Sequence, residues 1–143
     1  MFNVVVDYNP SEADNAVVRE GIIAHYEKTT GQRRDQEFSV FLKDASGKVL
    51  GGLQAFIDTE SIYIDIFWID ETLRNHGYGT SLLAAAELEA TKNGCAFSLV
   101  DTWDFQAEGF YINHGYDRIG ELKNYWLGHT KLFLRKQLRT MEQ

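Results

Sequence analysis

The stretch TLRNHGYGTSLL (72–83) decides how the chain is interpreted. It follows SIYIDIFWI (61–69), which is apolar at nearly every position and predicts a buried strand. It leads into a run of leucines and alanines with helical periodicity. The turn between them holds one arginine, Arg74, and two glycines, Gly77 and Gly79. A strand therefore passes into a helix through a turn with much backbone freedom and few side chains.

The helix predicted at 78–93 is followed by another apolar segment, CAFSLVDTW (95–103). Strand, helix and strand predict a right-handed β-α-β crossover. In chain order, the other predicted elements are a strand at 2–8, a helix from Ser11 to Gly31, strands at 36–44 and 49–58 that form a hairpin with a bulge at Gly51-Gly52, a short helix at 105–113, and strands at 116–122 and 129–138. The order β-α-β-β-β-α-β-α-β-β predicts a mixed α/β (α+β) fold, with a central mixed sheet flanked by helices.

Length and composition limit the possible classes of protein. A chain of 143 residues with 44% hydrophobic residues predicts a single domain over 1–143, with a core large enough to exclude disorder. We expect neither a membrane-spanning run nor a signal peptide, and the single cysteine, Cys95, fits a reducing compartment, most simply the cytoplasm. The net charge of −7 disfavours nucleic acid and anionic membranes as partners, and would attract cationic small molecules.

The glycine turn predicts an anion site. The first N–H groups of a helix have no partner within the helix, and the helix dipole adds partial positive charge there. Gly77 and Gly79 lack Cβ atoms, so the backbone can approach a bulky oxyanion, and Arg74 adds a permanent cation. A P-loop is excluded because no lysine follows the second glycine. A dinucleotide fingerprint is excluded because Leu82 stands where it needs a third glycine.

The turn resembles the signature of the GCN5-related N-acetyltransferase (GNAT) family, Arg/Gln-x-x-Gly-x-Gly/Ala between a strand and a long helix. Arg74, Gly77 and Gly79 match it position by position. A second segment, FQAEGFYINHGY (105–116), resembles the later motif of the family. With the order of elements, the resemblance covers nearly the whole chain and implies a GNAT-like fold that uses acetyl-CoA. No metal is expected, because the sequence has no metal-ligand spacing.

The resemblance also implies roles for particular residues. The strand before the turn would contact the pantetheine arm and the acyl carbonyl through its backbone at Phe67, Trp68 and Ile69. Tyr111 would protonate the departing thiolate, and a coenzyme contact would fall at Asp104, where the family often has asparagine. The pyrophosphate of coenzyme A would be held by Arg74, Asn75, His76, Gly77, Tyr78, Gly79 and Thr80.

An amine must be neutral to attack a thioester, so a carboxylate or a water chain must accept a proton. Asp65 is the first candidate because it is the only charged residue in its strand, where burial would raise its pKa. Asp101 and Glu60 are alternatives. We interpret the aromatic residues as mainly core, with one or two forming a wall of the acceptor pocket: Tyr63, Phe67, Trp68, Trp103, Phe105 and Tyr125.

The predicted function is acetyl transfer from acetyl-CoA to a primary amine of a small molecule or peptide, by direct attack in a ternary complex. A non-catalytic sensor of acyl-CoA is the alternative from another class, and an interaction domain that keeps only the fold is a third. A homodimer is a further expectation.

Overall fold

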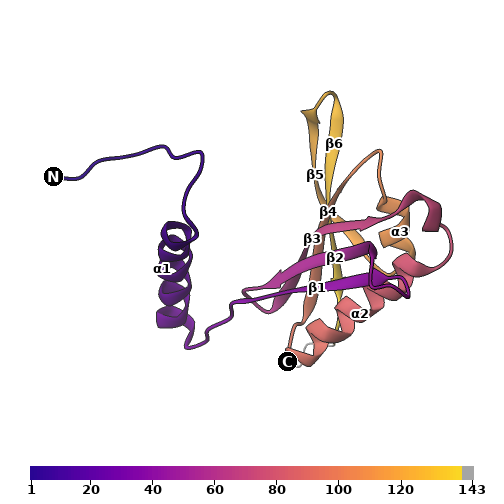
Figure 1. The fold of residues 1–143 in the computed structure, drawn as a ribbon, viewed down its shortest axis with the longest axis horizontal. Helices are drawn as coiled ribbons and strands as arrows, with labels where there is room; N and C mark the ends of the chain where they lie inside the picture. The colour runs from indigo at the N-terminus through magenta and orange to yellow at the C-terminus, as the bar shows by residue number, and fades with distance from the viewer. Residues whose placement is uncertain (140–143) are drawn as a thin grey trace. The chain divides into compact units, whose positions relative to one another are not determined.

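The computed structural model describes residues 1–139, which form two units, Met1–Asp35 and Gln36 onward (Figure 1). The first unit is built around one helix, α1 (Glu12–Thr30). The side chain of Ser11 caps its start by accepting a hydrogen bond from the amide of Asp14, and Gly31 ends it in the left-handed conformation, with φ 75°. The sequence predicted both ends of this helix.

The strand predicted at 2–8 is wrong. These residues have no strand partner and their apolar side chains are exposed, with Val4 102% and Val6 80% accessible. An isolated β-segment without a sheet neighbour leaves its backbone N–H and C=O groups unpaired, so periodicity in the sequence is not enough to form a strand.

The second unit is one six-stranded mixed sheet with the strand order β1-β2-β3-β4-β6-β5 (Figure 1). Its elements are β1 (Gln36–Lys43), β2 (Val49–Ile57), β3 (Ser61–Ile69), the 3₁₀ turn η1 (Glu71–Leu73), α2 (Tyr78–Lys92), β4 (Phe97–Trp103), α3 (Glu108–Asn113), β5 (Asp117–Trp126) and β6 (His129–Gln137). Among the strands of residues 36–139, β3 and β4 are the one parallel pair, and α2 connects them as the predicted crossover. Among residues 1–139, no helix is both long and apolar enough to cross a bilayer.

The pairing of β3 with β4 is short, and this positions the site. Their pairs run from Ser61 with Phe97 to Ile64 with Val100, although β3 continues to Ile69. The ends of the two strands are therefore free of each other, beside the turn that starts α2. A parallel ladder that stops early leaves backbone groups available at the carboxyl ends of strands, where ligands bind in α/β proteins.

The bulge predicted at Gly51-Gly52 is displaced by one residue. Leu42 pairs with Gly51 and Lys43 with Val49, so Leu50 is the residue without a partner on β1. The glycines serve close strand approach instead. A Cβ on Gly52 would lie 2.8 Å from the carbonyl oxygen of Val40.

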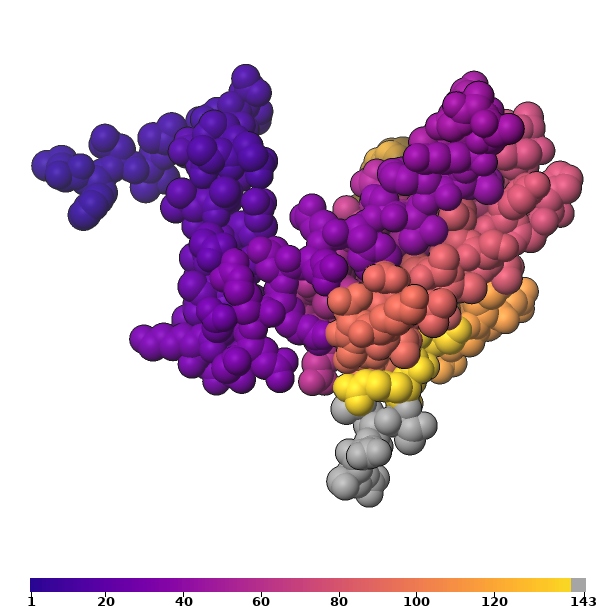
Figure 2. All heavy atoms as spheres, turned by 60° about the horizontal axis from the view of Figure 1, so that its bottom comes forward, coloured from indigo at the N-terminus to yellow at the C-terminus, as the bar shows by residue number. Residues whose placement is uncertain are grey.

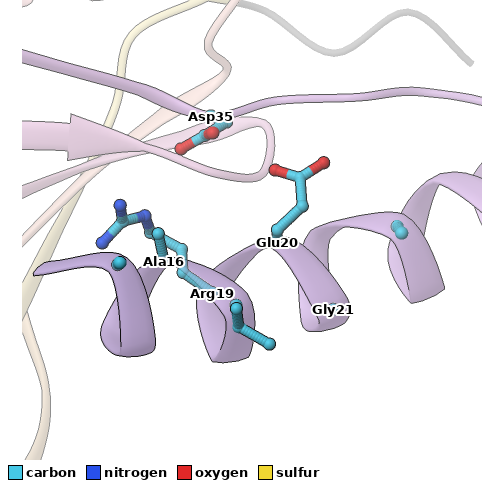
Figure 3. Close-up of a pocket in the computed structure, with 8 residues that line it drawn as sticks. Ala16, Arg19, Glu20, Gly21 and Asp35 are labelled. Atoms are coloured by element: carbon cyan, nitrogen blue, oxygen red, sulfur yellow. The ribbon is translucent and has the colours of Figure 1, made fainter.

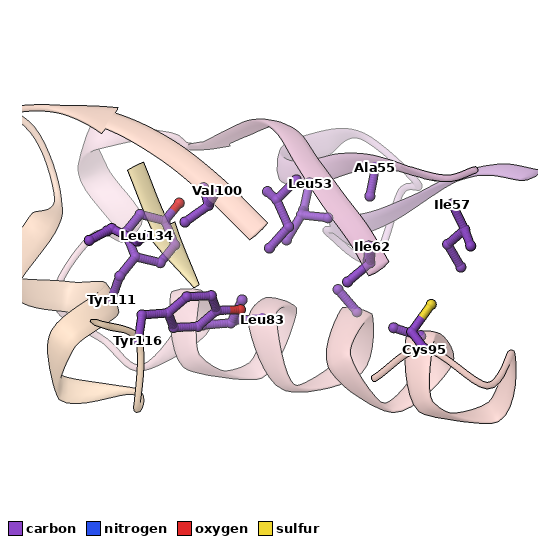
Figure 4. Packing of buried hydrophobic residues seen from close by; sticks show 13 residues of the cluster. Leu53, Ala55, Ile57, Ile62, Leu83, Cys95, Val100, Tyr111, Tyr116 and Leu134 are labelled. Atoms are coloured by element: carbon purple, nitrogen blue, oxygen red, sulfur yellow. The ribbon is translucent and has the colours of Figure 1, made fainter. Parts of the chain in front are cut away.

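The core lies between α2 and one face of the sheet (Figure 4). Leu82, Leu83, Ala86 and Ala90 form the buried stripe of α2, at helical spacing. Figure 2 brings this side of the second unit forward and shows α2 as a continuous surface on it. The core face of the sheet is formed by alternate strand residues that point toward α2, such as Leu53, Ile62, Val100 and Leu134.

A polar network crosses this core beneath α2. The hydroxyl of Tyr116 lies 2.8 Å from both Oε2 of Glu87 and Oγ of Ser98, and the ammonium of Lys136 lies 2.7 Å from Oε1 of Glu87. Since a phenol has one proton, Tyr116 donates to the carboxylate and accepts from Ser98. Burial, with Glu87 nearby, raises the pKa of Tyr116. The network ties α2 to β4, β6 and the segment that follows α3.

Candidate active site

The chain leaves β3 through a turn that its own side chains fix. Asp70 accepts hydrogen bonds from the amide and the hydroxyl of Thr72, at 3.0 and 2.6 Å, which starts η1 and lowers the pKa of Asp70. Arg74 then donates from Nε to the carbonyl oxygen of Ile69, at 3.0 Å. Its terminal nitrogens make no hydrogen bond within residues 1–139. The guanidinium is therefore held in place by Nε, and its terminal N–H groups are able to donate to a ligand.

The backbone after Arg74 twice enters the left-handed region, at Asn75 (φ 64°) and at Gly77 (φ 85°). Gly77 is the N-cap of α2, and no side chain caps this helix start, in contrast to Ser11 at α1. The amide of Ser81 makes the first helical bond, to the oxygen of Gly77 at 3.2 Å. The three preceding amides therefore have no backbone acceptor, and they form an uncapped, dipole-favoured site for an anion.

A cavity of about 670 Å³ opens at this helix start. It extends between the end of β3, the glycine turn and the beginning of α3. Nine of the predicted site residues line it together: Phe67, Trp68, Ile69, Arg74, Asn75, Gly77, Gly79, Thr80 and Tyr111. The cavity is large enough for an extended cofactor arm and has its anion site at one end.

Gly79 keeps this cavity open. A Cβ at Gly79 would lie 3.2 Å from Cε1 of Phe110 and 3.4 Å from Cδ1 of Ile69. Phe110, which the sequence analysis did not single out, packs its ring edge-on against Phe67 at 5.9 Å. In the sequence, the aromatic pair Phe110-Tyr111 in the motif at 105–116 was the feature that could have indicated this role of Phe110.

Thr80 is joined to α3 through His114. His114 donates from Nδ1 to the carbonyl oxygen of Phe110, at 2.7 Å, and its Nε2 lies 2.9 Å from the hydroxyl of Thr80. The Thr80 hydroxyl is therefore engaged by the ring, while the Thr80 backbone amide has no backbone acceptor. The arrangement holds the first turn of α2 against the helix that carries Tyr111.

Tyr111 is buried, with 5% of its surface exposed, and its ring packs against Phe67, Phe110 and Tyr116. Figure 4 shows it beside Tyr116, between the sheet and the helices. None of the hydrogen bonds within residues 1–139 involves its hydroxyl, and because no fully buried side-chain oxygen there lacks a partner, this oxygen reaches the open cavity. Burial, with the nearby charge of Asp101, raises the pKa of Tyr111 to about 12. The hydroxyl therefore stays protonated at neutral pH as an uncommitted donor at the cavity.

The burial predicted for Asp65 is wrong. In the pairing of β2 with β3, Gln54 faces Ile66 and Ala55 faces Ile64, so Asp65 is the extra residue of a bulge. A bulge turns its residue out of the regular alternation of the strand, and the side chain of Asp65 is exposed. The apolar neighbours of Asp65 in the sequence could not indicate this.

Three further predicted contacts lie outside the cavity lining, namely His76, Tyr78 and Asp104. Asp104 has a structural role: its Oδ2 accepts from the amide of Thr130 at 3.0 Å, and its Oδ1 lies 2.9 Å from Nδ1 of His129. The bond from the Thr130 amide is the main cause of its lowered pKa. Asp104 therefore ties the end of β4 to the β5-β6 hairpin.

Asp101, an alternative in the sequence analysis, has the surroundings that were expected for Asp65. It lies on β4 just beyond the last pair with β3, and its side chain is 23% exposed. It accepts a short hydrogen bond from the hydroxyl of Tyr63, and Nζ of Lys131 lies 3.3 Å from its Oδ1. Its charge also acts on Tyr111. Only the fold reveals this grouping, because its members come from β3, β4, α3 and β6.

A second hollow, of about 630 Å³, lies on the first unit (Figure 3). It is lined mainly by small side chains of α1, with Arg19, Glu20 and Asp35 at its border. Figure 3 shows Glu20 pointing away from the helix axis, and Glu20 pairs with Arg33 at 2.7 Å. This hollow has neither an uncapped helix start nor a buried titratable group, so it has no features of a reaction site.

Comparison with known proteins agrees with this geometry. The model of the acetyltransferase (GNAT) family matches residues 5–116. The chain is 39% identical over 93 residues to blasticidin-S acetyltransferase of Streptomyces morookaense, covering 64% of this chain and 68% of that relative. An acetyltransferase of Bacillus cereus ATCC 14579 superposes with a TM-score of 0.77 and 29% identity, over 93% of this chain and 97% of that one.

A crystal structure of aminoglycoside 6′-N-acetyltransferase complexed with coenzyme A has the same fold. Its TM-score is 0.68, over 93% of this chain and 97% of that one, and its identity of 14% speaks for the fold alone. The match to the family model covers most of the chain and includes the glycine turn, the uncapped helix start and Tyr111. The chain therefore belongs to the GNAT family of acetyltransferases and is an N-acetyltransferase.

Proposed function

We propose that this protein transfers the acetyl group of acetyl-CoA to a primary amine of a small molecule, by direct attack within a ternary complex. The observation that carries the proposal is the uncapped start of α2 at Gly77, which opens into the same cavity as Tyr111. An anion site and an uncommitted proton donor at one cavity suit a donor with a diphosphate and a thioester.

In this proposal the free amides at 78–80 and the guanidinium of Arg74 bind the diphosphate. The pantetheine arm lies along the end of β3, where backbone groups at Phe67 to Ile69 are not paired with β4. The thioester then lies near Tyr111. Charge-assisted hydrogen bonds from amides and guanidinium to phosphate are among the stronger polar contacts in proteins, so they would dominate the affinity for the donor.

The chemical step is a nucleophilic substitution at the acetyl carbonyl carbon. The lone pair of the amine forms the new C–N bond, the C–S bond breaks with its electron pair on sulfur, and the nitrogen loses one proton. Tyr111 donates a hydrogen bond to the departing thiolate. The proton from nitrogen passes to a carboxylate, directly or through water. Asp101 is better placed for this than Asp65, because it is half-buried and its charge already acts on Tyr111.

We further propose that both units form a single N-acetyltransferase domain over 1–143. The family model supports this, because its match runs from residue 5 to residue 116 and crosses the boundary between the units at Asp35. A peptide amine as acceptor, a cytoplasmic location and a homodimer remain predictions.

Two measurements test the proposal. Saturating acetyl-CoA at about 100 times its Kd should raise the free energy of unfolding by about 2.7 kcal/mol and the Tm by roughly 8 °C. A variant with Arg74→Ala and Gly77→Glu should lose this shift. Thiol release from acetyl-CoA is then followed with polyamines, aminoglycosides, amino acids and peptides. An unshifted Tm in the parent protein would refute donor binding. Binding without thiol release across the panel would favour a sensor.

A further inference from the structure

Four aromatic side chains gather where β4 ends and the β5-β6 hairpin closes. We call Trp103, Phe105, Tyr125 and Trp126 the aromatic wall. The ring of Trp103 stacks on Phe105 with centroids 5.8 Å apart, and lies 5.7 Å from Tyr125 and 5.5 Å from Trp126. Phe105 also lies 6.5 Å from Trp126. The four rings form one connected group although they come from two separate segments of the chain.

This group is exposed. Phe105, Tyr125 and Trp126 are 52%, 56% and 54% accessible. A cluster that served only to stabilise the fold would bury its rings, because each buried aromatic ring contributes a large apolar area. Several large rings kept together at the surface mark a binding surface more often than a packing element.

The aromatic wall borders the cavity that opens at the start of α2. Phe105 belongs to both, since it stacks on Trp103 and lines the cavity with Phe67 and Tyr111. Trp103 and Asp101 lie two residues apart on β4, so their side chains point to the same face of the sheet. A molecule on the wall therefore has the cavity on one side and the Asp101 carboxylate on another.

The structure already holds a cation at this position. Nζ of Lys131 lies 3.3 Å from Oδ1 of Asp101, 5.4 Å from the ring centroid of Trp103 and 5.5 Å from that of Tyr125. One carboxylate and two ring faces thus converge on a single ammonium group. Such a site would accept another alkylammonium in the same way, because cation–π and ionic attraction depend on charge and position rather than on the residue that supplies them.

We propose that the aromatic wall with Asp101 is the acceptor subsite, and that it selects amines that carry a planar aromatic or heteroaromatic group. The planar group stacks on the exposed ring of Trp126 and meets Phe105 edge-on, since these two rings are inclined by 56°. The ammonium group takes the position beside Asp101 in exchange for that of Lys131. The inference rests on the proposed function, because it places the acceptor beside the bound acetyl group. It adds the class of substrate to that function.

The test compares two primary amines of similar size, benzylamine and cyclohexylmethylamine, which differ in having a flat or a puckered ring. Both are titrated into the ¹⁵N-labelled full chain with coenzyme A present. The protein contains three tryptophans, so three indole N–H signals report binding, and single Trp→Phe variants assign them. We expect benzylamine to bind about fivefold more tightly and to shift the signals of Trp103 and Trp126.

Matched variants locate the effect. Trp126→Ala should reduce the preference for benzylamine to less than twofold. Phe41→Ala should keep it, since Phe41 is also half-exposed, at 50%, but lies on β1 away from the wall. Asp101→Asn should weaken both amines alike. Trp126→Leu is the second choice if the alanine variant does not fold. Equal affinity of the two amines, or wall signals that do not move, would overturn the inference.

The readout is binding and needs no acetyl transfer. If benzylamine is preferred on the wall but no amine releases thiol from acetyl-CoA, the proposed function fails and the aromatic-amine subsite stands. If thiol is released but benzylamine binds no more tightly than cyclohexylmethylamine, the proposed acetyl transfer is supported and the aromatic-amine subsite is refuted.

Discussion

Replacing Tyr111 by phenylalanine removes one hydroxyl from the cavity and leaves the packing of the ring unchanged. With a pKa of about 12, Tyr111 is a poor acid toward a thiolate whose own pKa is about 8.5. The gap of about 3.5 units makes complete proton transfer uphill by roughly 5 kcal/mol. In the proposed mechanism, Tyr111 therefore acts by donating a hydrogen bond to the sulfur as negative charge develops. Loss of one such preorganised donor lowers kcat by about 10² to 10³.

Tyr116→Phe is the matched control. Its hydroxyl is also buried but is bonded to Glu87 and Ser98, so its loss should cost about 1.5–3 kcal/mol of stability and little activity. Tyr111→Phe should show the reverse, since its hydroxyl makes no hydrogen bond within residues 1–139 and reaches the open cavity. The assays are urea unfolding for stability and single-turnover thiol release for chemistry. A Tyr111→Phe enzyme that keeps kcat within threefold would refute the assigned role.

Further expectations concern the same residues and can be checked independently. Gly77→Ala should lose about 1–2 kcal/mol in urea unfolding through its φ of 85° alone, because no atom lies within 4 Å of the added Cβ. Arg74→Ala should raise the KM for acetyl-CoA and make it less dependent on salt, which steady-state kinetics at 50 and 300 mM NaCl would show. Since folding raises the pKa of Tyr111 from 10.0 to about 12, its stabilisation is complete below pH 10 and is lost as the pH rises through 12. By pH 11 the wild type should lose about 1.4 kcal/mol relative to Tyr111→Phe in denaturant melts. Cys95 is fully buried and should react with a thiol reagent only after unfolding.

Local sequence predicted the glycine turn and both ends of α1, because these depend on neighbours within a few residues. Gly77 needs a left-handed backbone, and the sequence around it is sufficient to indicate this. The strand at 2–8 failed for the opposite reason: a strand exists only if another chain segment pairs with it. The burial predicted for Asp65 was wrong because a bulge depends on the register of β2 against β3, which the local pattern of apolar residues does not encode.

The importance of Asp101 and the aromatic wall could not be predicted in detail. Lys131 and Asp101 are thirty positions apart and meet only because β6 lies beside β4. The sequence analysis interpreted six aromatic residues as mainly core, with one or two forming a wall of the acceptor pocket. The core interpretation is wrong for Trp68, Phe105 and Tyr125, which are more than half exposed. The grouping of the aromatic wall depends on the β5-β6 hairpin, whose irregular register between Leu122 and Trp126 is not visible in the sequence.

The buried hydrogen bonds that Glu87 makes with Tyr116 and Lys136 fix the rotation of α2 about its own axis. A helix held only by aliphatic side chains can roll or slide by a fraction of a turn at small cost, because dispersion forces have little directionality. Hydrogen bonds to Glu87 are directional and allow one azimuth. The leucines and alanines of α2 can therefore be replaced by other apolar residues during evolution without rotating the helix. Its first amides then keep pointing into the same cavity.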